Sequence, residues 1–580
     1  MSIWKLFHKH LPALCIAIVI GIATGAPQFY VIHEMDVNYG GIFPEIGNDD
    51  RYYMSRSHEV RDGFPMLGNP YIYELRDAPS VSFWMPDAAL SYAGEILGLD
   101  VPHTFAFFNF VLPPVLFLLS YAILLRVMGK QTAALLGAAV FHLGLFLTTF
   151  SRSPSPQLNF IFIELAILFL LALIQNRSRA YVAALGCTLG ALFYVYPYYW
   201  TFAYGAIGTF FLIVFLQRQF REHALHLFVA LIGGVILGLP ALLRMIQMTH
   251  IQAYRDTVYR LGLIESHAPT GLLSIVFVAL LCFVFSIILY FLPSKRKDPY
   301  AWLFVSMAVG GIFVENTQIL TGKNGEFSAH YYLPIVYVVF LGAVYFLSLL
   351  LDVLSSTRKE WAQAAVCGVA IGICIVGATN SIIPRLKQDA GNISIQKYGT
   401  IIRWLNANTA PESVVFAGEE LSSLIPAYTS DRIFYSRNAN LHIMTDQEAW
   451  TRFLLEYRDA DLTDDFLTAH IGPIWGAQPY DEYGHQLQLN KFRSLVGLPI
   501  TPVQLLPDAS KTKFRIFATQ LQNQSVEKLL GDRRIDYVVS GPDFIQPKWL
   551  TQRFPQIEPV YASNGMTIFK LTTGLDKVPN

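Results

Sequence analysis

Long runs of apolar residues dominate the first two thirds of this 580-residue chain. A membrane-spanning helix needs about 20 mostly apolar residues. Eleven stretches meet or approach that length, namely 11–31, 103–126, 132–150, 157–174, 180–197, 200–216, 224–243, 269–292, 300–320, 331–353 and 361–383. The pattern predicts a polytopic α-helical membrane protein with about eleven transmembrane helices.

The pattern changes after Pro384, where charged residues rise from about a ninth of the chain to about a fifth. We therefore expect two domains: a transmembrane domain over 1–384, which includes a long first outer loop at 32–102, and an extracytoplasmic domain over 385–580. Strand and helix patterns alternate in the second domain, which predicts an α/β fold. The expected strands are Ser413–Gly418, Arg432–Ser436, Ile535–Ser540 and a hairpin around Asn564-Gly565, and the expected helices include 395–408 and Asp446–Arg458, the latter capped by Thr445.

Composition removes several classes of function. Hydrophobic residues make up 53% of the chain, so intrinsic disorder is excluded. Lys and Arg number 42, and Asp and Glu also number 42, so the chain lacks the basic excess that a nucleic-acid binder uses against phosphates. The five cysteines all lie in apolar stretches, so a metal site would have to use oxygen ligands.

Basic residues predict how the helices are oriented, because cytoplasmic connections carry an excess of Lys and Arg. If the N-terminus is cytoplasmic, every inside segment holds at least two basic residues: Lys5, Lys9, Arg126, Lys130, Arg177, Arg179, Arg218, Arg221, Lys295, Arg296, Lys297, Arg358 and Lys359. An odd number of spans then places the C-terminal domain on the other side. We expect a multi-pass protein of the plasma (bacterial inner) membrane with a periplasmic or extracellular C-terminal domain.

The first outer loop, 32–102, is much longer than most connections and contains twelve acidic residues against four arginines. Its most concentrated motif is Asp49-Asp50-Arg51-Tyr52-Tyr53. Adjacent carboxylates could bind a divalent cation, or one of them could serve as a general base. The alternative is a solvated acidic loop with surface ion pairs.

One helix, a long outer loop with an acidic pair, many further helices and an outer domain together resemble the GT-C superfamily of membrane glycosyltransferases. Two short segments near the start of the second domain, Ile401–Asn406 and Leu424–Thr429, resemble bacterial GT-C-like proteins. The resemblance implies a polyprenyl-phosphate-linked sugar donor and a catalytic or metal-binding carboxylate at Asp50 or Asp49, with Asp36 as a second candidate. The metal implied for Asp49 and Asp50 is Mg²⁺ or Mn²⁺. The Trp-Trp-Asp-Tyr-Gly signature is absent, which argues against an oligosaccharyltransferase.

Three basic residues on the predicted outer face are candidates for binding the donor phosphate. Arg152 lies between two spans, and a guanidinium group matches phosphate geometry; the alternative is an ordinary interfacial arginine. Lys323 and His330 lie in a late outer loop that, by the resemblance, lines the donor site. The alternative for them is a capping and turn cluster built on Gly322 and Gly325.

These features predict a membrane glycosyltransferase that moves a sugar from a polyprenyl-phosphate donor to a glycan, lipid or protein acceptor at the outer face, in contact with membrane lipids and without nucleic acid. Two alternatives remain open at this stage. One is a non-catalytic GT-C-like partner protein, and the other is a transporter of lipid-linked glycans.

Overall fold

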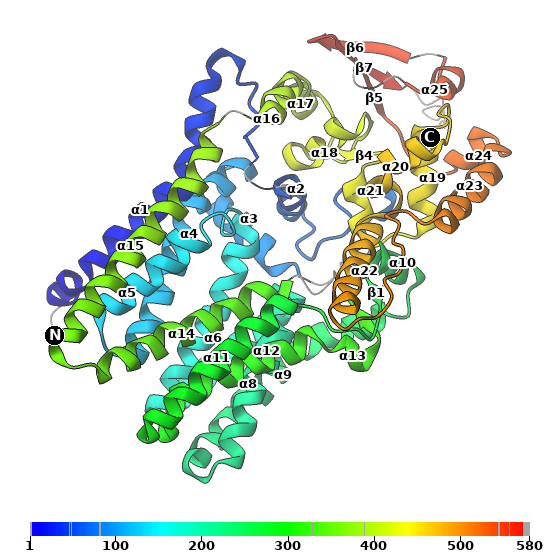
Figure 1. The fold of residues 1–580 in the computed structure, drawn as a ribbon. Coiled ribbons are helices and arrows are strands. Elements are labelled where there is room, and N and C mark those ends of the chain that lie inside the picture. Colours follow the sequence, from blue (N-terminus) through cyan, green and yellow to red (C-terminus); the bar gives the residue numbers. More distant parts are fainter. Residues whose placement is uncertain are drawn as a thin grey trace.

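The computed structural model describes residues 3–45, 47, 49–79, 83–325, 330–387, 389–542, 544, 546–555 and 557–571. Figure 1 shows a bundle of long helices with an α/β domain at one end. Helix α2 (Asp50–Arg61) lies between the bundle and this domain. The first loop and the C-terminal domain therefore lie at the same end of the bundle.

The described residues include nine helices that are long and apolar enough to cross a membrane, together with two shorter apolar helices. These eleven correspond to the eleven predicted spans. The bundle consists of α1 (Ile3–Met35), α4 (Val101–Met128), α5 (Gln131–Ala139), α6 (Asn159–Asn176), α7 (Arg179–Val195), α8 (Pro197–Leu216), α9 (Ala224–Met248), α11 (Leu272–Phe291), α12 (Pro299–Glu315), α14 (Tyr332–Val353) and α15 (Ser356–Leu386). The chain is thus a polytopic helical membrane protein with a C-terminal α/β domain, as predicted.

Glycines allow the closest helix contacts within the bundle. Helix α7 packs against α9, and each carries two glycines four residues apart, at 186 and 190 and at 234 and 238. A Cβ atom added to Gly234 would lie 3.2 Å from the carbonyl oxygen of Gly186. Small residues at this spacing let helix backbones approach in a bilayer, where van der Waals packing is a main source of association.

The C-terminal domain is built on a five-stranded sheet in the order β4-β3-β5-β7-β6. The strands are β3 (Val414–Phe416), β4 (Arg432–Ile433), β5 (Tyr537–Ser540), β6 (Ile557–Ser563) and β7 (Met566–Leu571). β3 is parallel to both β4 and β5, whereas β7 runs antiparallel to β5 and β6. Asn564 and Gly565 both have positive φ, 52° and 73°, as the predicted tight hairpin turn requires.

Helices surround this sheet. They are α16 (Ala390–Ser394), α17 (Gly399–Asn408), α18 (Glu419–Tyr428), α19 (Asp446–Glu456), α20 (Asp464–Ala469), α21 (Ile471–Trp475), α22 (Gln478–Leu495), α23 (Asp508–Gln522), α24 (Val526–Leu530) and α25 (Lys548–Arg553). The predicted cap of α19 is confirmed, because the Thr445 side chain accepts a hydrogen bond from the Glu448 backbone N–H at 3.2 Å. Helices α18, α20, α21, α22 and α23 were not predicted.

The remaining elements lie in the connections between the bundle helices. They are α3 (Met85–Ile96), α10 (Gln252–Arg260), α13 (Gln318–Thr321) and the two-stranded sheet β1 (Ile264–Glu265) and β2 (Lys323–Asn324). Arg260 of α10 is buried and donates to Asp446 at 2.5 Å and to the Met444 carbonyl at 2.6 Å. Helix α10 is therefore fixed to the C-terminal domain.

The first loop is folded against the C-terminal domain. Ile42, Tyr71 and Ile72 belong to the same apolar core as the residues of β3 and β5. The backbone N–H of Ile433 in β4 donates to the Tyr71 carbonyl at 2.8 Å. Loop and domain therefore share one core.

Buried ion pairs hold this junction. Arg432 of β4 pairs with Glu59 of α2 at 2.7 Å, and both side chains are only 2% exposed. Arg452 of α19 pairs with Glu74 of the loop, also at 2.7 Å. Several acids of the loop are thus structural partners of distant arginines, and the interpretation of the whole loop as solvated is wrong.

Candidate functional site

The acidic pair lies where α2 begins. Asp49 is the residue that precedes the helix, and Asp50 is its first residue. The positive end of a helix dipole favours negative charge at this place. The Asp50 carboxylate also accepts a hydrogen bond from the Gly47 backbone N–H at 3.0 Å, which fixes its direction.

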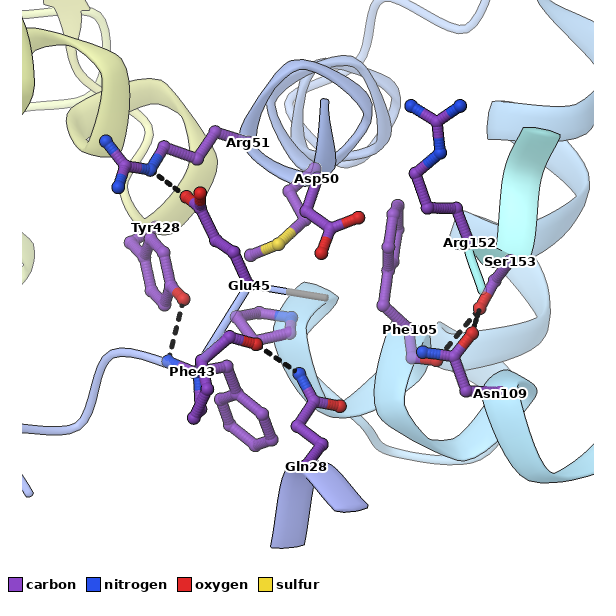
Figure 2. Close-up of a pocket in the computed structure, with 13 residues that line it drawn as sticks. Gln28, Phe43, Glu45, Asp50, Arg51, Phe105, Asn109, Arg152, Ser153 and Tyr428 are labelled. Carbon is purple, nitrogen blue, oxygen red and sulfur yellow. Dashed lines mark hydrogen bonds and ion pairs between the residues drawn. The ribbon is translucent and has the colours of Figure 1, made fainter. Parts of the chain in front are cut away.

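Asp50 lines a small pocket between α2, the bundle and α18. Figure 2 shows its carboxylate pointing into the space between Glu45 and Phe105, with Arg152 on the far side. The other described residues of the wall are Gln28, Phe43, Pro44, Arg51, Met54, Pro102, Asn109, Ser153 and Tyr428. Its volume is about 20 Å³, which is room for about one water molecule. The pocket is closed in this conformation.

Arg152 is the predicted phosphate ligand that the structure brings to the acidic pair. Its guanidinium donates to the Asp49 carboxylate and lies 5.5 Å from the centre of the Tyr53 ring. Burial alone opposes the charge, but the nearby Tyr53 and Asp49 raise the pKa of Arg152, so it remains a cation. Three of the six predicted site residues, Asp49, Asp50 and Arg152, therefore lie together.

A second arginine, which the sequence reasoning missed, lies near the same carboxylate. Arg385, at the end of α15, is close enough to Asp50 for their charges to interact. Its Nη2 makes only long contacts of 3.4 Å with the carbonyls of Leu147 and Thr148. Its Nη1 is buried without a hydrogen-bond partner among the described residues. The sequence signal that could have identified Arg385 is its position as the first charged residue after the last apolar span.

Glu45 is a further acid of the pocket wall. It forms an ion pair with Arg51, which also donates to the Ser423 hydroxyl of α18 at 2.7 Å. Burial raises the pKa of Glu45 although Arg51 opposes the shift. The pocket thus combines carboxylates with cations that partly neutralise them.

The other three predicted site residues lie elsewhere. Asp36 is exposed in a short 3₁₀ turn and does not line the pocket. Lys323 is exposed and lies opposite Glu265 in the β1–β2 sheet. His330 is hydrogen bonded to the Tyr196 hydroxyl at 2.7 Å and stacks on Tyr198. The structure therefore does not bring these three residues to the acidic pair.

The donor set fits a metal ion poorly. Among the described residues, no group of three His, Cys, Asp or Glu side chains is placed so that it could hold a metal ion. The carboxylate of Asp49 is taken by Arg152, and that of Glu45 by Arg51. A hard cation such as Mg²⁺ requires several oxygen ligands and would have to displace these guanidinium groups.

No family model and no curated protein matches the chain. Solved structures do. The oligosaccharyltransferase of Archaeoglobus fulgidus tethered to an acceptor peptide superposes with a TM-score of 0.50 and 13% identity, over 93% of this chain and 70% of that chain. The archaeal oligosaccharyltransferase AglB from the same organism with dolichol-phosphate gives 0.47 and 14%, over 100% and 75%. ArnT from Cupriavidus metallidurans bound to undecaprenyl phosphate gives 0.42 and 12%, over 98% and 99%.

The first of these superpositions covers both the helical bundle and the α/β domain, so it concerns the whole architecture and not one common module. At 13% identity it shows a shared fold and assigns no activity. The predicted resemblance is confirmed at that level: this chain has the fold of the GT-C membrane glycosyltransferases.

Proposed function

We propose that the chain is a glycosyltransferase that moves a sugar from a polyprenyl-phosphate donor to an acceptor hydroxyl at the extracytoplasmic membrane surface. Asp50 is the general base. Arg152 and Arg385 bind the donor phosphate. In this proposal the N-terminus is cytoplasmic, and the C-terminal domain lies outside the membrane of the cell.

The reaction needs few protein groups. The acceptor oxygen forms a bond to the anomeric carbon while the bond from that carbon to the phosphate oxygen breaks. The proton of the acceptor hydroxyl passes to the Asp50 carboxylate, and the polyprenyl phosphate leaves with the bonding electrons. Two guanidinium groups stabilise the negative charge that develops on the leaving phosphate. Attack from the opposite side inverts the configuration.

The observation that carries the proposal is the meeting of Asp50 with two arginines from distant parts of the chain. Arg152 follows the third apolar helix, Arg385 ends the last one, and Asp50 comes from the first loop. Among the described residues, Nη1 of Arg385 is buried and has no hydrogen-bond partner, and this costs free energy unless a ligand satisfies the group. A phosphate would do so.

The closed pocket implies a conformational step. A volume of about 20 Å³ cannot hold a sugar. We propose that the incoming phosphate replaces Asp49 as the partner of Arg152, which frees the start of α2 to move and opens the pocket. Neither a transporter nor a non-catalytic partner protein requires a base next to such a phosphate site.

The test separates binding from turnover. Undecaprenyl phosphate binding is measured on the purified chain in lipid nanodiscs, and transfer is measured as envelope glycan in a deletion strain of the source organism that carries each variant. We expect Asp50→Asn to lower transfer by at least about a hundredfold while lipid binding stays within a few-fold. Arg152→Ala and Arg385→Ala should weaken lipid binding.

Asp77→Asn is the matched control, because Asp77 belongs to the same loop and its side chain is 80% exposed. It should leave both readouts unchanged. Full transfer activity in Asp50→Asn, at equal membrane abundance, would refute the role of Asp50 and with it the proposed chemistry.

A further inference from the structure

A second cavity, of about 540 Å³, lies in the C-terminal domain. Pockets for small molecules usually have volumes of about 300–1,000 Å³. The described residues that line it are Tyr398, Gly418, Glu419, Glu420, Leu421, Glu456, Tyr457, Val539, Gly541, Pro542, Phe544 and Met566. Three carboxylates and three aromatic rings therefore face a space large enough for a disaccharide.

The cavity lies at a preferred ligand site of α/β sheets. Gly418 and Glu419 follow the carboxyl end of β3, and Gly541 follows that of the neighbouring parallel strand β5. The chain leaves β3 through α18 toward β4 on one side, and it leaves β5 through α25 toward β6 and β7 on the other. Ligands of open α/β sheets bind at such a switch point, outside the carboxyl ends of the strands.

The acids of this cavity are held in place by hydrogen bonds and by one long ion pair, in which Nε of Arg437 lies 3.9 Å from the Glu419 carboxylate. Glu419 accepts hydrogen bonds from the Ser436 hydroxyl at 3.0 Å and from the Arg437 backbone N–H at 3.0 Å. Glu456 is 7% exposed, and burial together with the charge of Glu419 raises its pKa well above the ordinary value. Burial also raises the pKa of Glu419 to about 7. Near neutral pH these groups therefore carry less than their full charge.

This chemistry selects among ligand classes. A nucleotide or other phosphate would meet three acidic side chains and be repelled. A cation would have to compete with Arg437 for Glu419, and it gains little from Glu456, whose pKa is raised by burial. Hydroxyl groups, in contrast, both donate to and accept from carboxyl groups, and the aromatic side chains Tyr457 and Phe544 in the wall can contact the apolar face of a sugar ring.

The cavity also adjoins the candidate active site. Glu420 in its wall is close enough to Glu45 for its charge to raise the pKa of that carboxyl group. Glu419 is likewise close enough to Arg51 for their charges to interact. Helix α18 connects the two places, because Glu419 and Glu420 lie in its first turn and Ser423, four residues after Glu419, contacts Arg51. A molecule bound in the cavity would lie beside the wall that contains Asp50.

We propose that this cavity binds a neutral saccharide unit of the acceptor, so that the acceptor is a glycan. This inference rests on the proposed transferase function.

Binding is tested by saturation-transfer NMR on the full chain in nanodiscs, with maltose, cellobiose, lactose, mannobiose and chitobiose as probes and spermidine as the cationic alternative. We expect signals from at least one disaccharide and none from spermidine. Glu456→Met removes a buried carboxyl group without shortening the side chain. We expect it to weaken disaccharide binding at least about tenfold, while the thermal midpoint stays equal or rises, because a buried acid next to another acid is lost.

Glu558→Met is the matched control, since Glu558 is exposed on β6 outside the cavity, and it should bind like the parent. Phe544→Ala is the second variant and should weaken binding without touching a carboxylate. Absence of binding for all five disaccharides, or binding of spermidine alone, overturns the inference. If undecaprenyl phosphate still binds in that case, the proposed function survives. Loss of both kinds of binding in Asp50→Asn would instead indicate a misfolded protein, so that variant must retain saccharide binding for the inference to hold.

Discussion

Removing the Arg432 side chain should destabilise the junction between the first loop and the C-terminal domain. Arg432 donates to Glu59 at 2.7 Å, to the Asn69 carbonyl at 3.0 Å and to Glu412 at 3.2 Å. In Arg432→Met, the Glu59 carboxyl group stays buried without its cation. Breaking a buried ion pair from one side costs about 3–5 kcal/mol. For a domain of this size that corresponds to a drop of roughly 6–20 °C in the melting temperature.

The double variant Glu59→Gln/Arg432→Met shows how much of this cost comes from the charge of Glu59, because it replaces the carboxyl group by a neutral amide. A buried neutral amide costs about 1–3 kcal/mol when it lacks partners, less than a buried charge. The double variant should therefore recover part of the lost stability. The assay is intrinsic-fluorescence melting of the purified chain in detergent, with Arg553→Met as the control because Arg553 is exposed. Equal melting temperatures for the single and double variants would refute the reasoning.

The same pair should affect transfer, since Glu59 and Asp50 belong to one helix. Movement of the far end of α2 displaces its start, and small misplacements of a catalytic group lower the rate strongly. We therefore expect Arg432→Met to reduce transfer even at a temperature where the chain stays folded, with the double variant again in between. Transfer at the parental rate in a destabilised Arg432→Met would separate the two effects and contradict this coupling.

Three further outcomes are expected. Burial and the nearby charges of Asp536 and Asp62 raise the pKa of Asp431 to about 7, so the charge of Asp431 destabilises the fold increasingly as the pH rises from about 4 to 7. The stability of Asp431→Asn relative to the parent should therefore increase by about 2–3 kcal/mol between pH 5 and pH 8. Melting curves across this pH range measure the difference, and a difference that stays constant would contradict the prediction. Thr445→Ala removes the cap of α19 and should cost about 1 kcal/mol in the same assay, whereas no change would mean that the cap is redundant. Because no three His, Cys, Asp or Glu side chains among the described residues are placed to hold a metal ion, transfer in isolated membranes should withstand EDTA, and inhibition that Mg²⁺ or Mn²⁺ reverses would contradict this expectation.

The membrane domain could be predicted because the bilayer imposes a simple rule on the sequence. Every span must be apolar over its length, so the eleven stretches could be read directly. The two shorter helices, Gln131–Leu145 and Arg179–Val195, still stood out by composition. The hairpin turn and the α19 cap could be predicted for a similar reason, since Asn564-Gly565 and Thr445 act within a few residues of themselves.

The two longest of the five helices that were missed in the C-terminal domain have sequences with weak local signals. Helix α22, Gln478–Leu495, is rich in polar residues, and only Pro479 and His485 are buried in it. Helix α23 buries three apolar residues within a largely polar segment. Such helices depend on tertiary contacts more than on a strong amphipathic pattern.

Half of the predicted site residues were found together in the structure. An acidic pair in a long loop is a visible signal, and Arg152 stands alone between two apolar spans. Arg385 is 335 positions from Asp50, and nothing in either segment points to the other. Conversely, Lys323 and His330 have the right chemistry, but backbone pairing and stacking hold them elsewhere. Residue type predicts what a group can do, and only the fold decides what it meets.

The buried acids explain why the loop needs its length. A short loop could place Asp50 at the membrane, but it could not also bring Glu59 and Glu74 to arginines of β4 and α19. Those contacts make the C-terminal domain part of the support of α2, so the proposed base Asp50 is held by a domain that is distant in sequence. In our proposal a saccharide bound at the carboxyl ends of β3 and β5 would contact the start of α18, and α18 contacts Arg51, the neighbour of the proposed base Asp50. One helix would then link acceptor binding to Asp50, and changes on α18 should alter both binding and transfer.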